Sequence, residues 1–158
     1  MSGWEAFGTV VGGATGALLG LLFVAVSIRA EPIARSAELR NRSAQTMALL
    51  LVGLLASALL TVPGQAKWVL GAEFLGLAAL ASGVGAVLNR RAGETGDALG
   101  RVLDNANPTL ITCALLLAVG VVLVLGHRDG LYFLVPALFA VLVGGVTNAW
   151  LILVRLSA

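Results

Sequence analysis

Long apolar stretches without charge dominate this sequence. Crossing the hydrocarbon core of a bilayer takes about 20 apolar residues at a helical rise of about 1.5 Å per residue. Five stretches meet this condition, and Glu73 is the one charged residue inside them. They predict a single all-α domain over residues 1–158, a bundle of five transmembrane helices at about residues 7–28, 46–63, 68–88, 107–126 and 131–154.

Two of the breaks between these stretches are short, so a smaller number of helices has to be considered. Residues 47–88 and 108–154 are each too long for one crossing, and each contains a turn signal: Pro63-Gly64-Gln65 in the first and residues 126–130 in the second. The chain is 59% hydrophobic and 11% charged, whereas soluble domains average about 25% charged residues. Lipid is therefore the predicted surrounding of five spans.

Basic residues are distributed unequally between the two sides that five spans would create. Lys and Arg favour the cytoplasmic side, and eight arginines fall on the side of the C-terminus while Lys67 and Arg128 fall on the other. The N-terminus is therefore predicted outside and the C-terminus in the cytoplasm. The preference for Arg over Lys, with abundant Ala, Gly, Leu and Val, is typical of GC-rich bacterial genomes and predicts a multi-pass protein of the bacterial inner (plasma) membrane. The eight arginines are Arg29, Arg35, Arg40, Arg42, Arg90, Arg91, Arg101 and Arg155.

The first arginine-rich connection has the pattern of a short helix. Glu31 and Arg35, and likewise Glu38 and Arg42, have the favourable i,i+4 order. Such a segment is expected to place Arg35, Arg40 and Arg42 on anionic lipid headgroups. The alternative is that it forms the solvated end of the first span.

The first span contains a regular row of small residues. Gly8, Gly12, Gly16 and Gly20 recur every four residues on one helical face, and such faces let helix backbones approach closely in lipid. Gly144 belongs to a similar row in the last span. The row predicts either close packing within one bundle or a homo-oligomer seam, a glycine zipper, and the spacing does not choose between them.

Glu73 is a candidate functional group because a carboxylate inside a span is costly. It follows Trp68 by five residues, so it is expected about 7 Å below the outer interface. Thr61, Thr15 and Tyr132 are its predicted neighbours by depth. Two interpretations remain open, a recess for a proton or cation and a structural or interfacial carboxyl.

Asn148 is a second polar candidate, predicted in the inner third of the last span. Ser82 reaches a similar depth, as do Ser27, Thr46 and Thr147, so a polar cluster is possible there. An interhelical hydrogen bond worth about 0.6 kcal/mol is the simpler explanation for such an Asn. Glu73 and Asn148 are expected too far apart to share a site unless water connects them.

The sequence lacks the residue sets that most enzymes and cofactor proteins require. Cys113 and His127 are the single cysteine and histidine, which disfavours metal or haem sites, and no paired carboxylates lie in one span. No catalytic activity, cofactor or metal is therefore expected, and the small net charge of +2 predicts no nucleic-acid partner.

Several short patterns resemble a group of small bacterial multi-span membrane proteins that are usually labelled hypothetical. They are residues 20–28, the Pro63-Gly64-Gln65 turn, and the last span with Tyr132, Pro136 and Asn148-Ala149-Trp150. The resemblance implies a membrane protein and transfers no activity and no site residues.

Two functional hypotheses follow from these features. The first is a self-associating bundle that offers a polar recess or path for an ion, proton or small solute, with Glu73 as its central group. The second is a non-conducting accessory subunit or scaffold that docks a partner membrane protein or anionic lipid. The expected partners are thus the lipid bilayer and either further copies of the chain or another membrane protein.

Overall fold

A computed structural model describes residues 2–92 and 108–157. These residues form an all-helical bundle, and no strand occurs in the two described ranges. The helices are α1 (Ser2–Ile28), α2 (Ala30–Arg35), α3 (Ala37–Thr61), α4 (Lys67–Ala92), α6 (Pro108–Val124) and α7 (Leu134–Ser157), and the 3₁₀ helix η1 (Arg128–Phe133) precedes α7.

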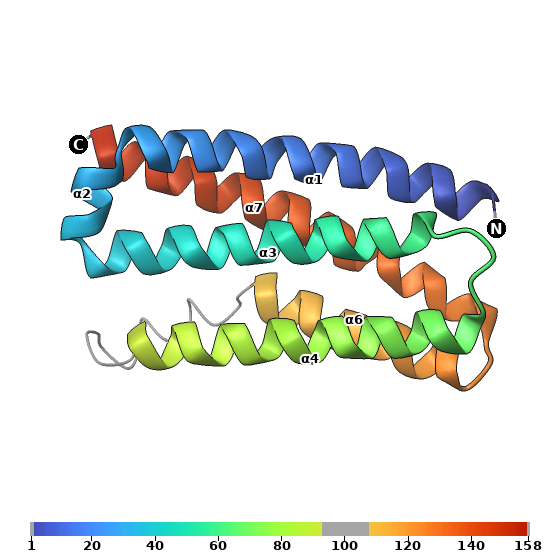
Figure 1. Ribbon diagram of the computed structural model, residues 1–158. Helices are drawn as coiled ribbons and strands as arrows, with labels where there is room; N and C mark the ends of the chain where they lie inside the picture. The colour runs from blue at the N-terminus through green and yellow to red at the C-terminus, as the bar shows by residue number, and fades with distance from the viewer. Residues whose placement is uncertain (1, 93–107, 158) are drawn as a thin grey trace.

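The five long helices lie side by side and alternate in direction along the chain (Figure 1). One end of the bundle holds α2, the end of α4 and the C-terminal end of α7, and is called the α2 end here. The opposite end holds the N-terminus, the turn between α3 and α4, and η1, and is called the η1 end. Arg35, Arg40 and the last turn of α4, with Arg90 and Arg91, therefore lie at the α2 end, while Lys67 lies at the η1 end.

Four helices are long and apolar enough to cross a membrane, which supports an integral membrane protein. They are Gly3–Ile28, Leu39–Thr61, Lys67–Leu88 and Gly130–Val154. The apolar helix Thr109–Val124 is shorter than these four. The 17 residues of α6 extend over about 26 Å, slightly less than the hydrocarbon thickness of about 30 Å.

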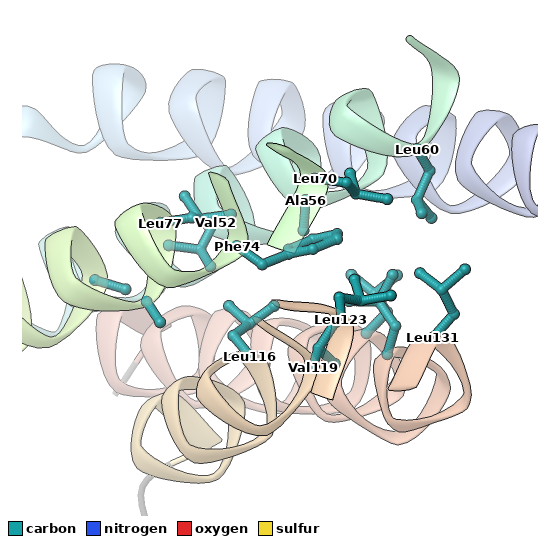
Figure 2. Packing of buried hydrophobic residues seen from close by; sticks show 14 of the residues in the cluster. Val52, Ala56, Leu60, Leu70, Phe74, Leu77, Leu116, Val119, Leu123 and Leu131 are labelled. Atoms are coloured by element: carbon teal, nitrogen blue, oxygen red, sulfur yellow. The ribbon is translucent and has the colours of Figure 1, made fainter. Parts of the chain in front are cut away.

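α3 is the central helix, because it contacts α1, α4 and α7, while α6 packs on α4 and α7. Phe74 of α4 is completely buried and lies between the two halves of the bundle, near Ala56 of α3 (Figure 2). Val119 and Leu123 of α6 face it from below in the same view. Large aliphatic side chains thus fill the middle of the described bundle.

Four glycines mark close approaches of α4 to α6 and of α3 to α7. A Cβ added at Gly71 of α4 would lie 3.0 Å from the carbonyl oxygen of Gly120 on α6, and one added at Gly120 would lie 3.0 Å from that of Gly71. At Gly53 of α3 an added Cβ would lie 2.6 Å from Val141 of α7, and at Gly145 of α7 it would lie 2.6 Å from Leu50 of α3. Only residues without a Cβ fit these crossings as they stand.

The helices extend beyond the apolar stretches that predict them. α1 begins at Ser2, α4 ends at Ala92, and α3 begins at Ala37, nine residues before the predicted span. The hydroxyl of Ser36 accepts a hydrogen bond from the backbone N–H of Leu39 and caps α3. Arg40 and Arg42 consequently belong to the first turns of α3 and not to the preceding connection. The last helix begins three residues later than predicted, because residues 128–133 form a 3₁₀ turn.

Candidate functional site

The α3–α4 turn places a polar pair at the η1 end. The side-chain amide N–H of Gln65 donates to a carboxylate oxygen of Glu73. Gly64 has φ +70°, a conformation that favours glycine, so the turn brings Gln65 back beside the second turn of α4. The sequence pattern did not predict this partner, although the amide of Gln65, eight residues before Glu73 and directly after the Pro63-Gly64 turn, was a usable signal.

The same amide group has a second, unsatisfied end. The Oε1 atom of Gln65 is buried and accepts no hydrogen bond. Gln65 also lines a small pocket of about 110 Å³ together with Trp4, Glu5 and Leu131. A carbonyl acceptor near a carboxylate-bearing residue has the chemistry to hold a hydrogen-bond donor or a small cation.

The structure places none of the predicted neighbours in contact with Glu73 through a hydrogen bond. The hydroxyl of Thr61 donates to the carbonyl of Ala58 at 2.8 Å, and the buried hydroxyl of Thr15 donates to that of Val11 at 2.8 Å. Tyr132 is 68% exposed and makes an edge-on contact with Trp4, with ring centroids 5.4 Å apart.

The polar residues predicted at the opposite end do not form a shared cluster. Ser27 and Thr46 each donate to a carbonyl of their own helix. Ser82 lies on the exposed side of α4, and Asn148 is half-buried on α7. Glu73 lies near the η1 end and Asn148 near the α2 end, so the described residues bring together no joint site for them.

Three of the four glycines in the predicted row face α3 of the same chain. A Cβ at Gly8 would lie 2.8 Å from the carbonyl oxygen of Ser57, one at Gly12 would lie 3.2 Å from Ser57 Cβ, and one at Gly16 would lie 3.6 Å from a methyl of Leu54. Gly20 has nothing within 4 Å. Gly144 is half-buried on α7.

The arginines predicted to meet lipid headgroups lie together at the α2 end. Arg35 forms an exposed ion pair with Glu31, which confirms the expected short helix and its i,i+4 pair. Arg40 donates to the carbonyl of Ala34 at 3.4 Å, and Arg42 is half-buried. The side chain of Glu38 lies outside the described part of the chain, so the Glu38–Arg42 pair stays a prediction. Arg101 also lies outside the described residues.

A larger hollow opens on the bundle surface between α3, α4 and the beginning of α6. Its volume is about 310 Å³. It exists because α6 starts level with Gly85, where an added Cβ would lie 3.7 Å from Thr109 Cγ2, while α4 continues for seven more residues to Ala92. Its walls are mostly aliphatic, with Gln45, Ser82, Thr109 and Thr112 as the polar lining residues.

No protein-family model, curated protein or solved structure matches the chain. The described residues contain no group of three or more His, Cys, Asp or Glu side chains placed to hold a metal ion. The resemblance to small multi-span bacterial proteins therefore stays a prediction, and function has to be argued from the geometry of the chain itself.

Proposed function

We propose that the chain is a non-conducting, non-enzymatic scaffold or accessory protein of the bacterial inner membrane. In this proposal α6 is the fourth of five spans, the N-terminus is outside, and the α2 end faces the cytoplasm. The arginine-rich composition of the α2 end supports this orientation. The protein acts through its lipid-facing surfaces, where it docks a second membrane-embedded chain, a further copy of itself in the first instance.

The observation that carries the proposal is the filled interior of the bundle. Phe74, Leu116, Leu134 and Leu138 are at most 1% exposed, and the buried hydroxyls of Thr15 and Thr46 are satisfied by carbonyls of their own helices. A path for ions or polar solutes requires a continuous line of polar groups or water through the span. The packing supports a protein that does not conduct.

The docking surface in this proposal is the outward side of α1. Of the four candidate spans α1 has the smallest buried share, 17% against 28–39% for the others. Gly8 and Gly12 pack against α3. A second row of small residues, Gly13, Ala17 and Gly20, is exposed, and a Cβ added at either of its glycines would have nothing within 4 Å. Small residues at such spacing support close helix association in lipid.

Two measurements test this function. Proteoliposomes should show proton and potassium flux no greater than empty liposomes, and flux above that level refutes the non-conducting claim. Native mass spectrometry in detergent should show an oligomer that Gly13→Leu or Gly20→Leu dissociates. Gly76→Leu is the matched control, because Gly76 is an exposed helical glycine of α4 with nothing within 4 Å. A wild-type monomer, or equal effects of all three variants, would contradict docking through α1.

The polar pair at the η1 end favours a second candidate function, a recess for a proton or small cation. Glu73 with the buried, unsatisfied oxygen of Gln65 supports it. If this candidate is correct, flux or cation binding appears in proteoliposomes and is abolished by Glu73→Gln. Equal signals from wild type and Glu73→Gln exclude it.

A further inference from the structure

We infer that the hollow between α3, α4 and α6 binds one acyl chain of an anionic phospholipid, with the lipid phosphate near Arg42. This inference rests on the membrane location in the proposed function. It is independent of docking through α1, which lies on other elements.

The hollow lies on the surface of the described helices, which faces lipid in the proposed membrane location. Leu51, Leu80 and Leu110 line it from three different helices and are 45–61% exposed. Leu49, Leu77 and Cys113 form its buried floor. An apolar hollow on a membrane-facing surface meets acyl chains as its solvent, so filling it with one of them removes a void without desolvating a polar group.

The length of the hollow fits one acyl chain. Its lining runs from Gln45 to Leu55 on α3 and from Leu77 to Leu88 on α4, which is about 15–17 Å at 1.5 Å per residue. That length matches one leaflet, half of the hydrocarbon thickness of about 30 Å.

Charge selects the headgroup at the end of the hollow nearest the α2 end. Arg42 lies one helical turn before Gln45, the first lining residue of α3, and shares its face at i,i+3 spacing. A phosphate placed beside Arg42 complements its guanidinium group, while a zwitterionic headgroup adds a cation to the same region.

The experiment uses the full chain in mixed micelles and a phosphatidylglycerol with a diazirine in its acyl chain. After irradiation, digestion and mass spectrometry, the label is expected mainly on residues 45–55, 77–88 and 109–113. Native mass spectrometry should show one tightly bound phosphatidylglycerol per chain, held more tightly than phosphatidylcholine.

Two pairs of variants separate a built site from general lipid contact. Gly85→Leu extends a side chain into the hollow and should lower the first binding constant at least tenfold, whereas Gly76→Leu on the same helix should leave it unchanged. Arg42→Gln should reduce the preference for phosphatidylglycerol about fivefold, since one arginine near anionic lipid contributes about 1 kcal/mol. Arg35→Gln, outside the hollow, is its control.

Three outcomes overturn the inference. The label spreads evenly over the exposed helix faces, or Gly85→Leu and Gly76→Leu bind lipid equally well. Alternatively, the bound lipid labels none of the residues that line the hollow. None of these outcomes affects the α1 docking test, whose variants lie on other surfaces.

Discussion

The crossing of α4 and α6 gives the sharpest test of the packing, through Gly71→Ala. An alanine Cβ at Gly71 would lie 2.9 Å from Val124 Cγ2, 3.0 Å from the carbonyl oxygen of Gly120 and 3.0 Å from the backbone N of Val124. Two of these three atoms belong to the backbone, so a side-chain rotation cannot relieve the contact. The helices have to separate, and the substitution should destabilise the bundle.

The size of the effect follows from a comparison with Gly76→Ala on the same helix. An extra methyl group in a packed interior costs about 1–3 kcal/mol, whereas Gly76 has nothing within 4 Å. The higher helix propensity of Ala, up to about 1 kcal/mol, applies to both variants and cancels in the comparison. Gly71→Ala is therefore expected to be less stable than Gly76→Ala by about 1–3 kcal/mol.

The assay is reversible unfolding in mixed micelles with increasing sodium dodecyl sulfate, followed by circular dichroism and tryptophan fluorescence. Both variants are measured beside the wild type under the same conditions. Equal unfolding free energies for Gly71→Ala and Gly76→Ala, within about 0.5 kcal/mol, would refute the close crossing of α4 and α6.

Three further substitutions test other contacts by the same unfolding assay. Ser36→Ala removes the cap on the Leu39 N–H and should cost about 1 kcal/mol; an unchanged midpoint would contradict the cap. Tyr132→Leu removes the edge-on contact with Trp4 and should cost about 0.5–1.5 kcal/mol, with a shift of tryptophan emission that is missing if the contact does not form. Gln65→Leu leaves the half-buried Glu73 without its amide donor and should destabilise by about 1–3 kcal/mol, whereas no loss would show that water replaces the amide.

The apolar spans were predictable because hydropathy reports directly on the cost of placing groups in hydrocarbon. Hydropathy, however, underestimated the lengths of the helices. Residues 37–45 form part of α3 although they include Arg40 and Arg42. The helix begins at its cap, Ser36, and not where the apolar stretch begins. Hydropathy measures the membrane and not the hydrogen bonding that terminates a helix.

The contacts between helices were predictable only in part. The regular spacing at Gly8 and Gly12 indicated a packing face, and these glycines do lie against α3. Gly71 and Gly120 form a similarly close crossing that no row of glycines predicts, because a single close approach needs one small residue on each helix. With 20 glycines in the chain, spacing alone cannot select them, and a Cβ added at Gly76 or Gly83 of α4 would have nothing within 4 Å.

The candidate sites depend on relative helix positions, which the sequence does not record. The hollow arises because α6 begins level with Gly85 while α3 and α4 continue past it. The partner of Glu73 is set by the conformation of the turn between α3 and α4. Depth along the span predicted Thr61 and Tyr132 as neighbours, whereas this turn places Gln65 within hydrogen-bonding distance of Glu73. Depth gives a level in the membrane but not an angle around the helix.

Cysteine accessibility across α6 tests the central claim, a fifth crossing, most directly. In a Cys113→Ala background, His127→Cys and Gly96→Cys are treated separately with a membrane-impermeant maleimide in intact cells and after permeabilisation. The account predicts that His127→Cys is labelled from outside and that Gly96→Cys is labelled only after permeabilisation. Labelling of both positions from the same side would show that α6 does not cross the bilayer and would contradict the five-span arrangement.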